Sequence, residues 1–155
     1  MFKLSQRSLD RLQGVHPDLV SLVKKAIELT EVDFTVTEGL RSKEEQQRLV
    51  AERKSWTFNS RHLTGHAVDL GAWVNGSLSY DWEYYFQIAD AMRRASIELG
   101  IPVQWGGLWR KNLAEEEGSL KGLQQIFVRD FQQAQGRSPH LDGPHFELPR
   151  IQYPS

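Results

Sequence analysis

Residues 60–73, with the sequence SRHLTGHAVDLGAW, bring together side chains that can bind a metal ion, just before an apolar segment typical of a buried strand. His62 and Asp69 lie seven positions apart in this segment. On a continuous helix that spacing corresponds to a rise of about 10 Å, and on a continuous strand it directs the two side chains to opposite faces. The chain must therefore turn between them if both are to reach one ion. Gly65 tolerates the dihedral angles that such a turn requires.

The surroundings of Asp69 on a strand over residues 67–73 favour an ion site. Asp69 shares its face of the strand with Ala67 and Gly71, whose side chains are the two smallest available, so we expect room there for an ion and its water. An acid on a core strand costs several kcal/mol unless something pairs with it. The opposite face is apolar and is expected in the core: Val68, Leu70 and Ala72.

A third ligand is available in the segment HFEL (145–148), where His145 and Glu147 share one face and the two apolar residues face the core. The predicted ligand set is His62, Asp69 and His145. Two imidazoles and one carboxylate suit Zn²⁺, and three protein ligands leave a coordination position for water, as in catalytic rather than structural sites. The chain contains no cysteine, so thiolate ligands and cysteine nucleophiles are excluded.

Hydrolysis at such a site also needs a base, and Asp142 is suitably placed three residues before His145. Gly143 and Pro144 would fix the turn between them. Glu147 competes for the role of base, or orients a histidine ligand.

Negative charge on the attacked oxygen requires a hydrogen-bond donor, and Arg41 is the best candidate because a guanidinium is charged at any working pH. Arg41 lies at the junction of a predicted strand (34–40) and a predicted helix (42–53). The alternative is that Arg41 simply pairs with an acid such as Glu38.

Composition excludes several other classes of protein. With 19 basic and 20 acidic side chains the net charge is −1, which gives no electrostatic footprint for nucleic acid. A chain of 155 residues can bury a core as one domain, so a metal ion would be functional rather than needed for folding. No run of eighteen apolar residues predicts membrane insertion, and no apolar run of signal-peptide length begins the chain. We expect a monomer that stays in the cytoplasm unless another protein releases it.

The elements that must position these residues alternate between helices and strands. A short polar arm (1–15) begins the chain, residues 55–66 form a loop, and an irregular part (108–141) contains a helix that begins near 115–119. The pattern predicts α+β structure with a small, mainly antiparallel sheet flanked by helices. The other predicted helices cover 17–30, 42–53 and 81–99, and the predicted strands cover 34–40, 67–73, 101–105 and 145–148.

Residues 60–69 match every fixed position of the pattern S-x-H-x-x-G-x-A-x-D, and in this they resemble the M15 zinc peptidases. That group includes D-alanyl-D-alanine peptidases and phage L-alanyl-D-glutamate endopeptidases. Residues 142–147 resemble the closing D-x-P-H-F-E element of the group, residues 37–42 the segment that bears its arginine, and residues 105–107 its W-G-G strand end. The matching elements extend from about residue 16 to residue 148.

The resemblance implies a hedgehog/DD-peptidase-like fold and a single zinc peptidase domain over 1–155. It implies Zn²⁺ ligation by the three residues named above, Asp142 as general base, and Arg41 as the group that binds the carbonyl or carboxylate of the substrate. The implied activity is that of an L-alanyl-D-glutamate endopeptidase that cuts peptidoglycan stem peptides. It would be a phage endolysin, held in the host cytoplasm until it is released to the cell wall.

This sequence departs from the pattern at two places. Leu108 follows W-G-G where many relatives carry aspartate, and residues 110–141 extend what is usually a short connection. The first departure concerns substrate contacts; the second suggests a lid, a wall-binding surface or a packing element.

Two alternative functions stay open at this point. One is a D-Ala-D-Ala carboxypeptidase or dipeptidase, which would use the same metal chemistry on a different bond. The other is a non-catalytic zinc domain that binds the wall or a protein, as in the resembling hedgehog signalling domains. Retention of both Asp142 and Arg41 speaks against the second alternative.

Overall fold

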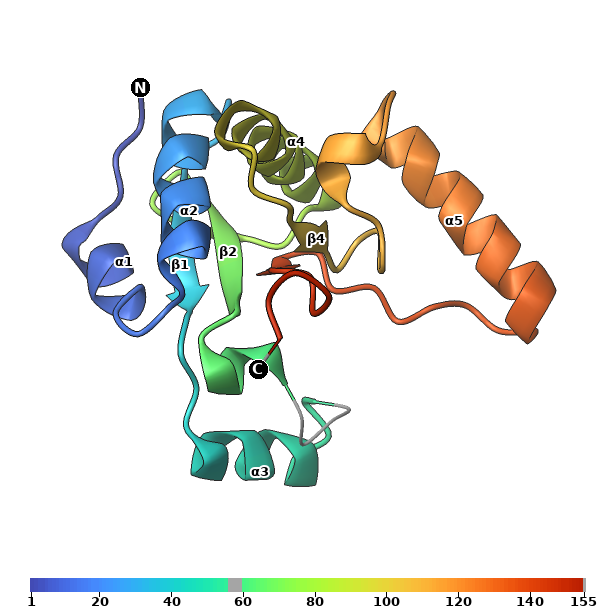
Figure 1. Cartoon of the computed structure of the whole chain (residues 1–155), viewed down its shortest axis with the longest axis horizontal. Helices are drawn as coiled ribbons and strands as arrows, with labels where there is room; N and C mark the ends of the chain where they lie inside the picture. The colour runs from blue at the N-terminus through green and yellow to red at the C-terminus, as the bar shows by residue number, and fades with distance from the viewer. Residues whose placement is uncertain (56–59, 155) are drawn as a thin grey trace.

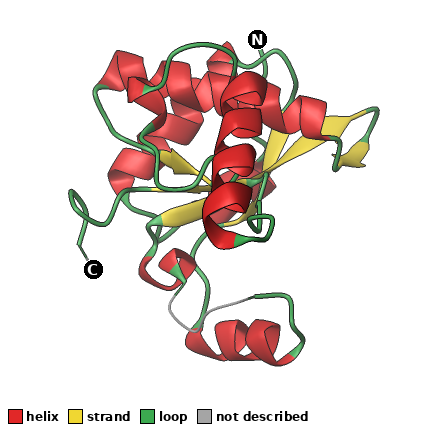
Figure 2. Ribbon diagram, turned by 90° about the vertical axis from the view of Figure 1, so that its right-hand side faces the viewer, coloured by secondary structure: helices red, strands yellow, loops and turns green. Residues whose placement is uncertain are grey.

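The computed structural model describes residues 1–55 and 60–154, which form an α+β fold (Figures 1 and 2). The fold class predicted from the sequence is confirmed. No helix in the described ranges is both long and apolar enough to cross a bilayer. The elements in chain order are α1 (Gln6–Arg11), α2 (Pro17–Leu29), β1 (Phe34–Glu38), α3 (Lys43–Ala51), the 3₁₀ helix η1 (Arg61–Thr64), β2 (Ala67–Val74), β3 (Ser77–Ser79), α4 (Trp82–Leu99), β4 (Gln104–Trp105), the 3₁₀ helix η2 (Leu113–Glu115), α5 (Leu120–Gln135) and β5 (His145–Glu147).

The sheet is antiparallel at every pairing that the described residues make. Its strands follow the order β1-β2-β5-β4, and β3 pairs with β2 as a hairpin. The register places Asp69 of β2 opposite Glu38 of β1 on one side and opposite His145 of β5 on the other. Side chains opposite one another on antiparallel strands lie about 5 Å apart. Three chemically active side chains from distant parts of the chain are thereby aligned across the sheet.

Strand alternation divides the sheet into an apolar face and a face that carries the polar cluster. Val68, Leu70 and Ala72 are fully buried in the hydrophobic core, as are Phe146 on the neighbouring strand and Leu148 directly after it. Helices α2 and α4 pack against each other and complete this core, as Figure 1 shows. The polar cluster therefore lies on a rigid support whose reverse side is closely packed.

The N-terminal segment, predicted as a polar arm, contains the helix α1, so that prediction is wrong. The Ser5 side chain caps α1 by accepting a hydrogen bond from the Ser8 amide. The Ser8 hydroxyl accepts a bond from the Val36 amide at 2.9 Å, and the Arg11 guanidinium donates to the Val36 carbonyl at 2.9 Å. α1 thus binds the edge of β1 through polar groups, and its sequence shows no apolar periodicity for this reason.

Helices α3 and α5 extend away from the sheet (Figures 1 and 2). Gln46 is the one buried residue of α3, and Leu120 is the one buried residue of α5. Both helices flank the polar face, so they form two sparsely packed arms beside a dense centre.

Candidate metal centre

The turn before β2 has the geometry that the spacing of His62 and Asp69 requires. The Ser60 side chain accepts a hydrogen bond from the His62 amide at 3.2 Å and so begins η1. Gly65 ends η1 with φ +76°, and a Cβ at this position would lie 2.4 Å from the Gly14 carbonyl oxygen. Only glycine satisfies both conditions. Of the loop predicted over 55–66, residues 56–59 lie outside the described residues.

The three predicted ligands converge on one point. The Asp69 Oδ1 atom lies 3.2 Å from His62 Nε2 and 3.3 Å from His145 Nδ1, and all three candidate ligand atoms lie within 4.8 Å of one another. The side chains of the two histidines are 3% and 9% exposed, and that of Asp69 is 20% exposed. The group can hold a metal ion, with Asp69 on its more open side.

Each imidazole uses its other nitrogen to fix its orientation. His62 Nδ1 lies 2.9 Å from the Gly39 carbonyl oxygen, which can only accept, so this nitrogen donates and Nε2 keeps a free lone pair. His145 Nε2 lies 2.8 Å from Glu147 Oε1, which leaves Nδ1 for the ion. Metal-binding histidines in proteins are held in this way.

The ionisable groups of the cluster shift one another's pKa values. Burial lowers the pKa of the His145 imidazole, but its hydrogen bonds with Asp69 and Glu147 outweigh burial and raise the pKa to about 10. Burial raises the pKa of the Asp69 carboxyl, yet its bonds with His145 and His62 hold that pKa well below its usual range. The carboxylates of Asp69 and Glu147 thus favour positive charge beside His145, and a divalent cation would supply such charge.

Asp142 lies on a turn that is anchored to the end of β4. Its amide donates to the Gly106 carbonyl at 2.9 Å, the Gly106 amide donates to the His145 carbonyl at 2.8 Å, and the Trp105 indole donates to the Gly143 carbonyl at 2.6 Å. A Cβ on Gly106 would lie 2.2 Å from the Asp142 carbonyl oxygen. The W-G-G segment therefore positions the turn that carries Asp142 and His145.

The Asp142 carboxyl is open to a cleft of about 580 Å³ that the three candidate ligands and Arg41 also line. The cleft walls remove part of its hydration, and this desolvation, together with the charge of Asp69, raises its pKa. A carboxyl with a raised pKa is suited to accept and return a proton near neutral pH.

Arg41 lines the same cleft and is held by two side chains. Its Nε and Nη2 atoms donate to the two carboxylate oxygens of Glu38, and Nη1 donates to the Gln46 amide oxygen. The pairing with Glu38 that the sequence left open is thus present. A guanidinium has five N–H donors, so this pairing orients Arg41 and still leaves donors for a ligand.

Sequence reasoning missed Arg61 and Trp109. The Arg61 side chain is 3% exposed; its Nη2 atom donates to the Leu148 and Tyr153 carbonyls, and its Nε atom lies 3.9 Å from Glu147 Oε2. The Trp109 ring centroid lies 5.5 Å from that of His145. Arg61 occupies a variable position of the 60–69 pattern, and Trp109 lies within the part predicted to be irregular (108–141), so no local signal marked either.

The small size of Gly71, which the sequence linked to room for an ion, has a packing reason. A Cβ on Gly71 would lie 2.8 Å from the Leu78 side chain and 3.0 Å from the Thr37 side chain. Gly71 is small because β1 and β3 approach it from both sides. Leu108, which departs from the family pattern, is 2% exposed and belongs to the hydrophobic core, so it acts in packing.

Comparisons with known proteins agree with this geometry. A family model described as phage L-alanyl-D-glutamate peptidase matches residues 1–149. The L-alanyl-D-glutamate peptidase of Escherichia phage T5 is 31% identical over 112 residues, which cover 70% of this chain and 82% of that protein. The crystal structure of the Serratia marcescens L-Ala D-Glu endopeptidase ChiX superposes with a TM-score of 0.76 at 40% identity, over 99% of this chain and 95% of that one.

These matches confirm the resemblance drawn from residues 60–69 and 142–147, and with it the fold and the peptidase class. Because the family model covers nearly the whole sequence, the assignment does not depend on one short motif. The chain belongs to the phage L-alanyl-D-glutamate peptidase family.

Proposed function

We propose that this chain is a zinc-dependent endopeptidase that hydrolyses the L-Ala–D-Glu bond of peptidoglycan stem peptides. The observation that carries the proposal is the convergence of two imidazoles and one carboxylate within 4.8 Å, in a cleft that also contains Asp142 and Arg41. A domain that only binds a partner would need neither a base such as Asp142 nor a guanidinium such as Arg41 beside its metal ion. The choice of bond rests on the family, which is described as L-alanyl-D-glutamate peptidase.

His62, Asp69 and His145 would hold the ion. Their two nitrogens and one oxygen form the ligand set of catalytic zinc sites, and the bonds to Gly39 and Glu147 support ligation through the remaining nitrogens. When bound, zinc supplies Lewis acidity, which makes water more acidic and a carbonyl more electrophilic.

Asp142 moves the proton in this proposal. Its carboxylate takes a proton from the attacking water and then gives it to the nitrogen of the departing amine, so the residue ends the cycle as it began. The raised pKa of Asp142 supports both halves of this transfer, because a carboxyl of ordinary acidity is a weaker base and returns the proton less readily.

Arg41 binds and orients the substrate. The donors that Glu38 and Gln46 leave free can hydrogen-bond the carbonyl oxygen on which negative charge develops, or a carboxylate of the D-Glu residue. The pair of bonds to Glu38 fixes the plane of the guanidinium, which is what recognition of a planar group requires.

Product analysis of a peptidoglycan digest tests the proposal. We expect mass spectrometry to find stem peptides that lack L-Ala, released from the glycan with D-Glu as the new amino terminus. A chelator should abolish release, and added Zn²⁺ should restore it. Loss of terminal D-alanine alone would instead identify a D-Ala-D-Ala peptidase, and absence of any new terminus with the metal-loaded protein would identify a non-catalytic domain.

We further propose that the enzyme works as a monomer on the cell wall after its release from the host cytoplasm. The proposal rests on the likeness to a phage peptidase and on the single cleft that contains the whole candidate site. Sedimentation at working concentration tests the monomer, since a dimer that persists at those concentrations would contradict it.

A further inference from the structure

A groove of about 760 Å³ continues from the catalytic cleft toward α5. Three residues line both the groove and the cleft: Trp109, Glu147 and Arg150. The rest of the groove is formed by β4, the segment that follows it, α5 and the C-terminal tail. These elements contribute Gln104, Arg110, Asn112, Glu115, Phe127, Phe131, Pro149, Ile151 and Gln152. Its volume lies within the range of about 300–1,000 Å³ that is common for sites of small organic ligands.

Trp109 forms the junction between the two spaces. Its ring packs beside His145 with 5.5 Å between the centroids, and its indole nitrogen donates to the His140 carbonyl at 2.6 Å. The ring is therefore fixed at the edge of the candidate metal centre. A ligand that extends from this centre along the groove must pass the face or edge of Trp109.

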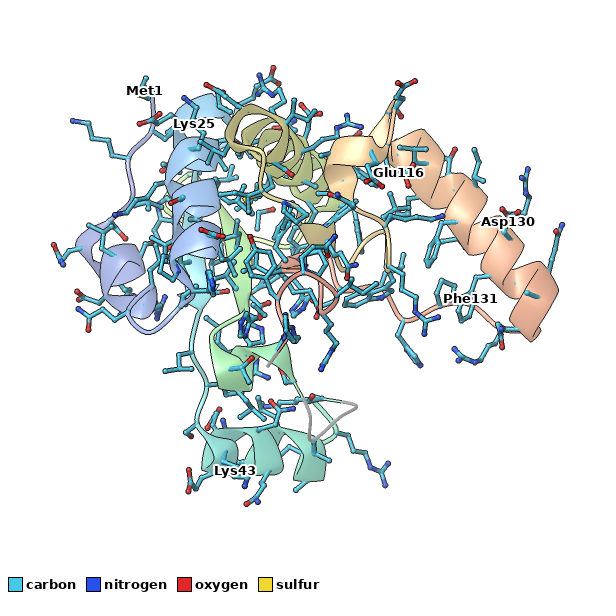
Figure 3. All side chains as sticks on the ribbon, viewed as in Figure 1. Met1, Lys25, Lys43, Glu116, Asp130 and Phe131 are labelled. Atoms are coloured by element: carbon cyan, nitrogen blue, oxygen red, sulfur yellow. The ribbon has the colours of Figure 1, made fainter. Side chains whose placement is uncertain are left out.

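The groove combines aromatic rings with polar groups of both signs. Phe127 and Phe131 supply ring carbons from α5, with 6.2 Å between their centroids, and Figure 3 shows Phe131 on the side of α5 that faces the segment returning to β5. Gln104, Asn112 and Glu115 supply amide and carboxylate groups to the same groove. Arg110 and Arg150 offset Glu115 and Glu147, so the charge is mixed and does not favour a polyanion.

A saccharide has this combination of surfaces. One face of a pyranose ring presents C–H groups that stack on aromatic carbons, while its hydroxyl and acetamido groups both donate and accept hydrogen bonds. An amphipathic helix from a partner would require a more continuous apolar lining than these amides and carboxylates provide. The lining therefore favours a sugar over a protein segment.

We propose that this groove binds an N-acetylated hexosamine of the glycan strand to which the stem peptide is attached. This inference rests on the proposed function. In a stem peptide one L-Ala joins the cleaved bond to the lactyl group of the sugar, and one residue spans at most about 3.6 Å. The sugar must then lie beside the metal centre, where the groove begins. The D-Glu side would extend toward α3, where Lys54 lines the cleft.

Two substrates with the same scissile bond test the groove: a free stem peptide, and the same peptide attached to its N-acetylated disaccharide. We expect the intact enzyme to cut the glycosylated substrate with a kcat/KM at least about tenfold higher, equivalent to one strong stacking contact. Phe131→Ala should bring this ratio close to one and leave cleavage of the free peptide unchanged. Ile126→Ala is the matched control, because Ile126 is 50% exposed on α5 and does not line the groove.

The outcomes separate this inference from the proposed function. If the free peptide is cut and Phe131→Ala leaves the ratio unchanged, the groove does not bind the glycan. If neither substrate is cut, the proposed function fails, and calorimetry with the free disaccharide then decides the inference alone: binding that Phe131→Ala weakens supports it, and no binding overturns it. A dimer that Phe131→Ala dissociates would assign the groove to a second copy of the chain and overturn the proposal.

Discussion

The candidate metal centre and the arms differ in how their residues are held. At the centre, three side chains are fixed from behind by a packed sheet face and from the sides by hydrogen bonds to Gly39 and Glu147. In the arms, most side chains of α3 and α5 face solvent, and each helix buries a single residue. A site that needs ligand atoms in fixed positions is built on the first kind of structure, and a surface that adapts to a polymer can be built on the second.

The largest effect is expected from His145→Ala, which removes one ligand and the partner of Glu147. We expect Zn²⁺ binding and peptidoglycan cleavage to fall by more than the factor of about 10²–10⁴ that a general base contributes. His66→Ala is the matched control, since His66 lies in the same segment as His62 but bonds to the Thr64 hydroxyl. Metal content by mass spectrometry and cleavage assays measure both; a zinc-loaded, active His145→Ala protein would contradict the ligand assignment.

Asp142→Asn should remove the proposed base and leave metal binding intact. The amide has the same shape but cannot accept the proton, so we expect kcat to fall by about 10²–10⁴ with metal content unchanged. Asp130→Asn, on the exposed part of α5, should leave the rate as it is. Equal rates for the Asp142→Asn variant and the intact protein would show that another group, with Glu147 the first candidate, is the base.

Replacing glycine by alanine should lower the free energy of unfolding at the centre and raise it in an arm. Gly106→Ala forces a Cβ to within 2.2 Å of the Asp142 carbonyl oxygen, which costs about 1–3 kcal/mol of unfolding free energy by overpacking. Gly122→Ala, inside α5, meets only the Ser119 hydroxyl at 3.3 Å and gains about 0.5–1 kcal/mol from helix propensity. Urea unfolding measures both. If both substitutions changed the unfolding free energy in the same direction, the centre would be no more tightly packed than the arm.

The sequence was most informative where local pattern and chemistry coincide. The alternation Val68, Asp69, Leu70 predicts which side chains are buried because a strand has period two, and Gly65 predicts a turn because few other residues tolerate its φ. The three candidate ligands were predictable from their types and from a family pattern. Their convergence, by contrast, depends on the register that sets Asp69 opposite His145.

The features that the sequence did not predict depend on contacts between distant residues. α1 has no apolar periodicity because its Ser8 and Arg11 side chains bind the edge of β1. Arg61 looks like a solvated cation in the sequence, and only the fold buries it against the carbonyls of the C-terminal tail. The small size of Gly71 was assigned to the ion, whereas neighbouring strands are the cause.

Glu147→Gln should produce a smaller loss than removal of a ligand. The amide keeps the size of the side chain but weakens the bond to His145 Nε2 and removes the charge near Arg61, so we expect Zn²⁺ affinity to fall about 10–100-fold. Glu117→Gln, on the exposed segment before α5, is the matched control. Competition with a fluorescent chelator measures the affinity, and an unchanged value would show that Glu147 does not orient His145.

The smallest effect concerns the tail that covers Arg61. The Tyr153 hydroxyl donates to the Asp18 carboxylate at 2.6 Å, and burial, this bond and the charge of Asp18 raise the pKa of Tyr153 to about 12. Tyr153→Phe removes one hydrogen bond to a charged group, so we expect a loss of about 1–2 kcal/mol in unfolding free energy at neutral pH. Tyr80→Phe is the control, since Tyr80 is 74% exposed.

The sign of the pH dependence follows from the direction of this shift. Because the folded state binds the Tyr153 proton more tightly than the unfolded state, whose tyrosine titrates near pH 10, the stabilisation is complete below about pH 10 and is lost as the pH rises toward 12. The difference in unfolding free energy between the intact protein and Tyr153→Phe should therefore be constant near neutral pH and shrink above pH 10. A difference that does not change over this range would mean that the hydroxyl contributes packing rather than a bond to Asp18.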